Sequence, residues 1–375
     1  MHTFIRILAC LLIIVLLLSI LVLTAGAMPA VSGECACLYL PQNNLLICDK
    51  NASKRHPMAS TTKIMTALVV LEHCGMGEPV IIPQEATGIE GSSVYLRPEE
   101  CHTVENLLYA LLLASANDAA AALAIHTAGS IEAFADMMNA CAAELALQDT
   151  HFTNPHGLAD PEHYTTAADL ARITAAAMQN QTFCNIVATK SKVITSQDGS
   201  VKRTLVNHNK LLRQYEDCVG VKTGFTKKSG RCLVSAAERD GMLLIAVTLD
   251  APDDWRDHAS LLNYGFSQYE GRALSEANSF SFDLPVIGGK TESVRITARN
   301  QTSIAVERHS PPLIPSFEIN RFATAPIKEG QVLGVIRYTQ NNRTVVTVPL
   351  LAEESVEKAE IRYNLFEKIK NFLNL

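Results

Sequence analysis

The sequence predicts an α/β (α+β) domain over residues 33–270, then a small all-β domain over 271–356 and an amphipathic helix over 357–375. Three observations support this prediction. Helix-like and strand-like hydrophobic spacings are mixed up to residue 270, whereas the later runs are short and strand-like. The final segment places its apolar side chains on one helical face. The length of 375 residues is enough for one large core or two ordinary ones.

The first domain is predicted to open with a β-hairpin, because the turn-rich residues 41–44 join two short apolar runs. A helix is predicted from Ser60, since apolar residues follow it at helical spacing. The predicted strands of this domain are 35–39, 45–48, 219–223, 233–237 and 243–249. The other predicted helices are 104–114, 118–128 and a segment through 261–264. The predicted strands of the second domain are 280–286, 294–298, 303–307, 332–338 and 344–348.

Residues 1–27 have the pattern of a secretory signal peptide. Arg6 precedes the uncharged apolar run 7–23, and Ala25-Gly26-Ala27 offers a cleavage point. An uncleaved anchor helix is the alternative, because this run approaches the ~18 apolar residues of a membrane span. Either reading places the rest of the chain outside the cytoplasm.

The terminal helix is expected to lie on a membrane surface, with its charged residues away from the apolar face. Packing of this helix against its own domain is the alternative. Nothing follows the helix in the sequence to cover its apolar face.

Composition excludes some partners. The net charge of −6 and the absence of any Lys/Arg-rich run argue against nucleic acid. Nine of the ten cysteines would remain after signal cleavage, scattered and odd in number, so we expect buried free thiols. The eleven histidines show no ligand spacing, so neither a metal site nor a cofactor is predicted.

Ser60-Thr61-Thr62-Lys63 has the Ser-x-x-Lys spacing of an acyl-transfer site that uses no histidine. On a helix, residues three apart share a face, so the Lys63 amine can reach the Ser60 hydroxyl. Lys63 can take the hydroxyl proton only if burial or a nearby cation lowers its pKa, and Lys222 is the candidate cation. In isolation the motif is better explained as a serine N-cap beside a surface lysine, and a second Ser-x-x-Lys occurs at 355–358.

Ser115-Ala116-Asn117 falls between two predicted helices, where both polar side chains can face one cleft. The Ser115 hydroxyl can relay a proton there. The Asn117 amide can bind a peptide carbonyl and hold Lys63 in place. Alone, this tripeptide is more often a helix cap.

Lys222-Thr223-Gly224 is predicted on an edge strand, where a cation and a hydroxyl suit a substrate carboxylate. Gly224 leaves room for the acyl group. The N–H of Phe225 can pair with that of Ser60 as an oxyanion hole.

Together the three motifs resemble those of penicillin-binding proteins and class A β-lactamases. The chain is most similar in pattern to the low-molecular-weight penicillin-binding proteins that act as serine-type D-alanyl-D-alanine carboxypeptidases, peptidase family S11. Residues 55–71, 154–158, 166–172, 219–230 and 325–331 also resemble family signatures, so the likeness covers nearly the whole mature chain. The resemblance implies a penicillin-binding/β-lactamase-like transpeptidase domain standing on a β-domain pedestal.

The resemblance also implies an activity. The enzyme would remove the terminal D-alanine from peptidoglycan pentapeptide stems through an acyl-enzyme on Ser60, with Lys63 as general base. Lys222 and Thr223 would bind the terminal carboxylate. Penicillin would inhibit because its lactam mimics the D-Ala-D-Ala end, and the last helix would hold the exported enzyme on the extracytoplasmic face of the cell membrane.

One position departs from the family pattern. Family members usually carry an arginine before the helix that follows the third strand of the motif region, where it helps to hold the carboxylate. This sequence has Asp254 there, and Arg256 two residues later is the predicted substitute.

Three other functions compete with the carboxypeptidase. A D,D-endopeptidase that cuts cross-links would use the same motifs. A class A β-lactamase needs Glu-x-x-Leu-Asn, and the closest segment, 144–148, ends in Gln148. A non-catalytic penicillin sensor should have lost a motif residue, and every catalytic position is filled here.

Overall fold

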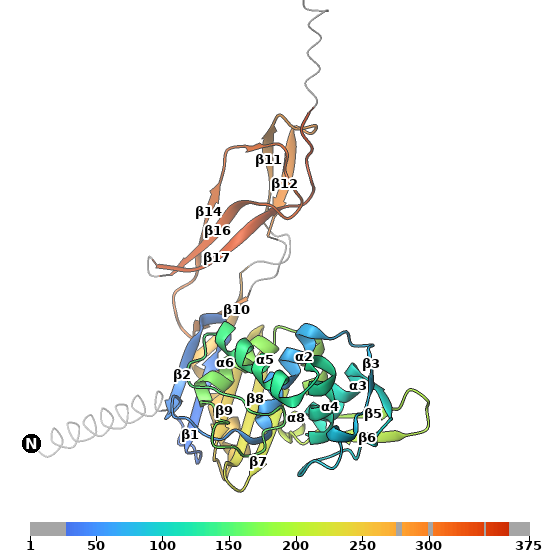
Figure 1. Ribbon diagram of the computed structural model, residues 1–375. Coiled ribbons are helices and arrows are strands. Elements are labelled where there is room, and N and C mark those ends of the chain that lie inside the picture. Colours follow the sequence, from blue (N-terminus) through green and yellow to red (C-terminus); the bar gives the residue numbers. More distant parts are fainter. Residues whose placement is uncertain (1–27, 275–279, 299–302, 341–342, 360–375) are drawn as a thin grey trace, which may run out of the picture. The chain divides into compact units, whose positions relative to one another are not determined.

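The computed structural model describes residues 28–274, 280–298, 303–340 and 343–359. The chain divides into two units, Met1–Arg239 with Leu243–Gln268 and Asp240–Met242 with Tyr269–Leu375. Each unit is described by itself below, and Figure 1 labels most of its elements. The predicted signal peptide lies outside the described residues.

The first unit contains a five-stranded sheet in the order β2-β1-β9-β8-β7. The bounds of its strands are β1 Cys35–Leu40, β2 Leu45–Lys50, β7 Cys218–Thr226, β8 Gly230–Arg239 and β9 Met242–Leu249. β1 and β2 form the predicted antiparallel hairpin, and β7 pairs with β8 through Thr226↔Gly230. β7 is an edge strand, which confirms the predicted position of Lys222-Thr223-Gly224.

Both faces of this sheet are covered. All six residues of β1 are buried. The thiol of Cys37 donates to the carbonyl of Ala167 in α6, whereas Leu38 faces Gly265 in α9. Because neighbouring strand residues point to opposite faces, α6 and α9 cover opposite sides of the sheet.

The helices of this unit are α2 Lys63–His73, α3 Val104–Leu113, α4 Asn117–Ala128, α5 Ile131–Glu144, α6 Ala167–Ala177, α7 Gln181–Ala188, α8 Leu211–Gln214 and α9 Asp254–Gln268. Helix α2 packs against α3, α4, α5 and α6, and residues 63–70 of it are all buried. A helix that is apolar on every side belongs in a core. The run of buried alanines in α4 allows that helix to approach α2 closely.

The predicted helix start at Ser60 needs a correction. Ser60 lies in a short 3₁₀ helix, η2 Ala59–Thr62, and the α-helix begins only at Lys63. The Thr61 and Thr62 hydroxyls donate back to the carbonyls of Met58 and Ala59, which favours this tighter turn. Ser60 therefore lies at a sharp turn rather than within a regular helix.

Shorter elements complete the first unit. Two small antiparallel pairs are β3 Pro79–Ile81 with β4 Cys101–Thr103, and β5 Ser191–Thr195 with β6 Lys202–Val206. The remaining 3₁₀ helices are η1 Pro41–Asn43 and η3 Gln84–Ala86.

The second unit has only β-strands as regular structure among its described residues, as predicted. A six-stranded sheet has the order β14-β16-β17-β12-β11-β15, and β10 pairs with β13. The bounds are β10 Tyr269–Ala273, β11 Ser281–Ile287, β12 Ser293–Thr297, β13 Ser303–Glu307, β14 Ile314–Ile319, β15 Ala323–Thr324, β16 Val332–Gln340 and β17 Arg343–Ala352. This unit has its own core, which includes Leu284, Ile296, Ile336 and Leu350.

The terminal helix predicted over 357–375 does not begin at residue 357. Lys358 forms an isolated antiparallel bridge with Gly289, which keeps the chain extended there. Residues 360–375 of that predicted helix lie outside the described residues. Within the described ranges, no helix is both long enough and apolar enough to cross a membrane.

Candidate functional site

The structure places the Lys63 amine at the centre of a group of oxygen atoms. Its Nζ lies 2.9 Å from the Ser60 hydroxyl, 2.7 Å from Oδ1 of Asn117 and 2.7 Å from the carbonyl oxygen of His156. A neutral amine has two N–H donors and one lone pair. The two carbonyl oxygens can only accept, so they take the two N–H groups, and the lone pair is left facing the Ser60 hydroxyl.

The surroundings of Lys63 favour that neutral form. Its side chain is 0% exposed. Burial, and then the positive charge of Lys222, hold the pKa of Lys63 well below its usual range, although Asp118 opposes this. Burial also lowers the pKa of Lys222 to about 7. Because Lys63 gives up its proton more readily, a neutral Lys63 beside a protonated Lys222 is the favoured pairing near neutral pH.

Asn117 begins α4 and holds its position through both its backbone and its side chain. Its N–H donates to the carbonyl of Ser92 at 2.7 Å, and its Nδ2 donates to the carbonyl of Glu90. The amide oxygen is thereby turned toward Lys63. Ser115 precedes it with a φ of 60°, a left-handed conformation that makes the sharp bend between α3 and α4.

The loop 154–157 supplies the third oxygen that faces Lys63. Oδ1 of Asn154 accepts from the N–H of Gly157 at 2.7 Å, and the Thr66 hydroxyl donates to the carbonyl of Pro155 at 2.6 Å. Gly157 has a φ of 87°, and a Cβ there would lie 1.9 Å from the carbonyl oxygen of Ala59. The loop therefore packs directly against η2, and only glycine fits.

The edge strand β7 also lies close to the Ser60 turn. A Cβ on Gly224 would be 3.1 Å from the backbone nitrogens of Ser60 and Thr61. Gly224 thus permits close approach of β7 to η2, in addition to the predicted room for substrate. Lys222 is 1% exposed and its amine donates to the carbonyl of Thr223 at 2.9 Å.

These elements enclose a cleft of about 320 Å³. The predicted site residues that line it are Ser60, Ser115, Thr223, Gly224 and Phe225. Lys63, Asn117 and Lys222 are buried beside or beneath it. The cleft is also lined by Ser92, His208, Lys210, Arg231, Asp254 and Trp255. Of these six, the sequence pattern identifies only Asp254. The others come from loops, from the start of β8 and, for Trp255, from the first turn of α9.

Arg256 is not among the residues that line this cleft. Its guanidinium is paired with Asp253, and its side chain is 75% exposed. Arg231 lies in the cleft instead. Its Nε and Nη2 donate to the buried carboxylate of Asp254 at 2.8–3.1 Å, and its guanidinium carbon lies 5.8 Å from the centre of the Trp255 ring.

In the described part of the chain, two groups of metal-ligand side chains lie close together. They are Cys74 with Glu78 and His126, and Glu34 with His56 and Asp250. Neither includes a residue that lines the cleft. The nine cysteines of the described residues are all free thiols.

Comparison with known proteins assigns the two units to known families. Residues 24–253 match the D-alanyl-D-alanine carboxypeptidase family, peptidase S11. Residues 269–358 match the C-terminal domain of penicillin-binding protein 5.

Individual relatives agree with this assignment. D-alanyl-D-alanine carboxypeptidase DacF of Bacillus subtilis is 31% identical over 83% of this chain and 82% of its own length. A D-alanyl-D-alanine endopeptidase of Escherichia coli is 30% identical over 61% of this chain and 74% of its own. The crystal structure of penicillin-binding protein 5 from Haemophilus influenzae has a TM-score of 0.66 and 26% identity, over 88% of this chain and 99% of its own. The chain therefore belongs to the D-alanyl-D-alanine carboxypeptidase family, peptidase S11.

Proposed function

We propose that Ser60 is the nucleophile through which this protein acts as a D-alanyl-D-alanine carboxypeptidase on peptidoglycan stem peptides. The observation that carries the proposal is the buried Lys63 amine, whose Nζ lies 2.9 Å from the Ser60 hydroxyl oxygen. A serine attacks only as its proton leaves, and an unprotonated amine at this distance can receive it.

The reaction follows in two halves. The Ser60 oxygen attacks the carbonyl carbon of the D-Ala–D-Ala peptide bond as its proton passes to Lys63. The N–H groups of Ser60 and Phe225 stabilise the oxyanion, since an edge strand keeps alternate N–H groups free of its neighbour. The proton then passes through Ser115 to the leaving amine, D-alanine departs, and water hydrolyses the acyl-enzyme.

Penicillin labelling tests the nucleophile and its base. Ser60→Ala and Lys63→Ala should each abolish covalent labelling, because a β-lactam carbonyl needs the same attack. The second Ser-x-x-Lys provides a matched control, so Ser355→Ala and Lys358→Ala should label like the wild type. Full labelling of Ser60→Ala would overturn the assignment.

Arg231 is our candidate for the missing family arginine. Asp254 stands where the family pattern has that arginine. The Arg231 side chain reaches the Asp254 carboxylate from β8. Within the described residues, its Nη1 has no hydrogen bond or ion pair with the protein. That donor can reach a substrate carboxylate from the cleft wall together with Thr223 and protonated Lys222.

The carboxylate role of Arg231 predicts a change in selectivity. Arg231→Lys should lower kcat/KM about tenfold for a peptide ending in a free carboxylate, since a charged hydrogen bond contributes ~1.5–3 kcal/mol. A peptide ending in D-alaninamide should be affected far less. Arg256→Lys serves as the control and should leave both rates unchanged. Equal losses on both peptides would show that Arg231 acts through Asp254 only.

The location of the protein is a second part of the proposal. An apolar leader in residues 1–27 and an amphipathic segment in 360–375 support export and attachment to the outer face of the cell membrane. Deletion of residues 360–375 should release the mature protein from membranes. If the shortened protein still sediments with them, the N-terminal apolar run is the anchor.

A D,D-endopeptidase is the second candidate, favoured by the similarity to the Escherichia coli endopeptidase. Pentapeptide stems and cross-linked dimers, offered at equal concentration, separate the two activities. Faster release of D-alanine than cleavage of the dimer supports the carboxypeptidase, and the reverse order supports the endopeptidase.

A further inference from the structure

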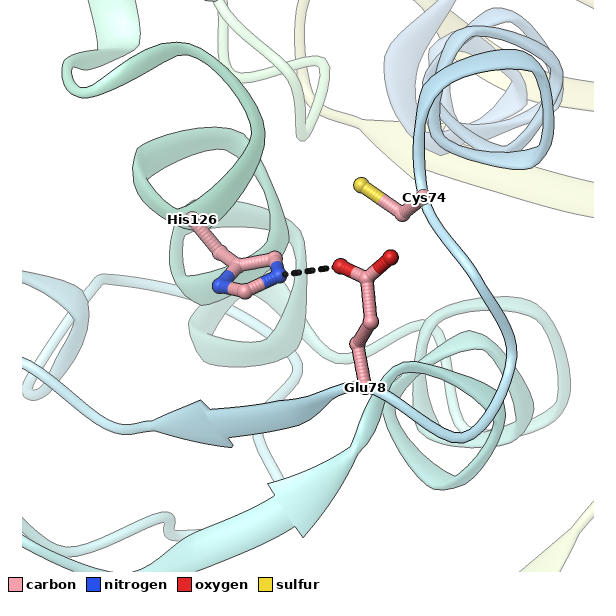
Figure 2. A group of neighbouring side chains, drawn as sticks. All are labelled: Cys74, Glu78 and His126. Carbon is pink, nitrogen blue, oxygen red and sulfur yellow. Dashed lines mark hydrogen bonds and ion pairs between the residues drawn. The ribbon is translucent and has the colours of Figure 1, made fainter.

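Three side chains with different donor atoms converge at the end of α2 that is opposite Lys63. Cys74 follows α2, Glu78 precedes β3, and His126 lies in the last turn of α4. Figure 2 shows the thiol, the carboxylate and the imidazole pointing toward one another. One ligand atom from each residue lies within 4.8 Å of the other two.

The spacing of these donors suits a shared metal ion. Nε2 of His126 lies 3.2 Å from Oε2 of Glu78. Nitrogen and oxygen ligands at ~2.0–2.1 Å from a tetrahedral Zn²⁺ are about 3.3 Å apart, and a thiolate at ~2.3 Å lies only slightly farther away. The imidazole and carboxylate are therefore already at the separation that a common ion requires.

The electrostatic surroundings also favour a cation. Helices α2 and α4 both end here, with the N–H groups of Cys74 and Gly129 bonded to the carbonyls of Val70 and Ile125. The carboxyl end of each helix carries partial negative charge. The Glu78 carboxylate, whose Oε1 accepts from the N–H of Gly75 at 2.6 Å, adds negative charge at the same place.

We propose that Cys74, Glu78 and His126 bind one divalent transition-metal ion of the Zn²⁺ class, with water as the fourth ligand. A thiolate and an imidazole select Zn²⁺ over Mg²⁺ or Ca²⁺. As the Sγ–metal bond forms, the thiol proton is released to solvent. The proton on Nε2 of His126 exchanges through water to Nδ1, which frees Nε2 for the metal, and the hydrogen bond between His126 and Glu78 is replaced by a bond from each to the metal. The Thr127 hydroxyl donates to the carbonyl of Leu123 at 2.8 Å, and its oxygen lies 3.3 Å from Sγ, so the thiol donates to it.

Two differences decide against the other group of close ligand atoms, Glu34, His56 and Asp250. Glu34 is already paired with the amine of Lys54, which supplies the positive charge that a metal would bring. Nδ1 of His56 also lies 2.8 Å from the carbonyl of Pro57. Among the described residues, no lysine or arginine is paired with Glu78, whose side-chain partner is the imidazole of His126.

The proposed ion would join two helices that carry catalytic groups at their other ends. Helix α2 begins at Lys63 and α4 begins at Asn117, whose side chains are hydrogen-bonded. The metal would therefore link the C-terminal ends of α2 and α4. Histidine spacing gives no sign of the site because its ligands come from three separate elements.

Cobalt titration of the full chain, without an affinity tag and with its thiols reduced, tests the site. Co²⁺ should give a near-ultraviolet thiolate-to-metal absorption band that saturates at one equivalent and disappears when Zn²⁺ is added. Zn²⁺ at a hundredfold excess over its Kd should raise Tm by about 5 °C.

Variants identify the ligands. Cys74→Ser should remove the near-ultraviolet band, and Glu78→Gln and His126→Ala should each weaken Zn²⁺ binding at least about tenfold. Cys184→Ser, which alters another partly buried thiol, should keep the band. Penicillin labelling should persist in all four variants and shows that each is folded.

Two results would overturn the proposal. One is a wild-type protein that labels with penicillin but gives no cobalt band and no rise in Tm with Zn²⁺. The other is a band of unchanged intensity in Cys74→Ser.

Discussion

At the scale of single residues, the chemistry depends on two buried lysines that must be in opposite charge states in the active enzyme. Lys63 must be neutral to accept the Ser60 proton, whereas Lys222 must be protonated to attract a carboxylate. Burial lowers the pKa of both, and the charge of Lys222 lowers that of Lys63 further. Near neutral pH, the favoured state of the pair therefore has Lys222 protonated and Lys63 neutral.

This pairing predicts a bell-shaped pH profile of kcat/KM. Activity should fall at low pH as Lys63 gains a proton and loses its function as a base. It should also fall as pH rises past the Lys222 pKa of about 7, because the deprotonated amine no longer attracts the substrate carboxylate. Initial rates at low substrate concentration, between pH 4 and pH 10, measure both limbs.

Lys222→Met distinguishes this account from a single titrating group. Removing the Lys222 charge should raise the pKa of Lys63, so the acid limb of penicillin acylation should move to higher pH. Lys210→Met, which changes an amine elsewhere in the cleft, is the control and should leave that limb in place. An acid limb at the same pH in Lys222→Met would show that the two amines are not coupled.

At the scale of elements, the Ser60 turn is fixed by backbone that approaches it from two sides. β7 reaches it through Gly224, and the loop 154–157 reaches it through Gly157. At both positions a side chain would not fit. A Cβ on either glycine would meet main-chain atoms of η2 or of Met58, the residue before η2.

Gly157→Ala should therefore slow penicillin acylation at least about tenfold, because the clash with the Ala59 carbonyl displaces either Ser60 or the His156 oxygen. Gly129→Ala is a matched control. Gly129 has a similar φ of 85°, but a Cβ there meets nothing within 4 Å. This control should lose about 1 kcal/mol of stability from backbone strain and keep its acylation rate. Equal acylation rates in the two variants would contradict the role given to the loop.

The elements that sequence pattern predicts are those with a strong local signal. The β1–β2 hairpin has a turn-rich connection, and β7 and β8 have apolar runs on either side of a Gly/Lys/Ser turn. Helix α6 has its N-cap at Thr166, but alanines replace most of the large apolar residues that would show periodicity. β3 and β4 are three residues each, too short for any period to appear.

The residues of the candidate site also fall into those that a local sequence pattern predicts and those that it does not. Ser60, Lys63, Ser115, Asn117, Lys222 and Thr223 belong to contiguous motifs, and the structure brings all of them to one place. The cleft wall is different, because His208, Arg231 and Trp255 are single residues on separate segments. Arg231 is the clearest case: its place beside Asp254 depends on the register of β8 against β7, which no local pattern reveals.

At the scale of the whole molecule, the two units have separate cores. The large core of the first unit draws on residues up to Leu249, and that of the second begins at Leu274. The residues that line the cleft all belong to the first unit. The chemistry should therefore be independent of the β-domain.

A protein ending at Gln268 should consequently fold and be labelled by penicillin at a rate close to that of the longer chain. The measurement is the acylation rate, with circular dichroism to establish folding. A folded but unlabelled fragment would mean that the second unit contributes to the reaction.

The central claim is that Ser60 hydrolyses the terminal D-Ala–D-Ala bond. The most direct measurement is the release of D-alanine from a synthetic peptide ending in Lys-D-Ala-D-Ala, with Ser60→Ala as the control. The account predicts release by the wild type and none by the variant. Release by both proteins, or by neither when both are folded, would contradict it.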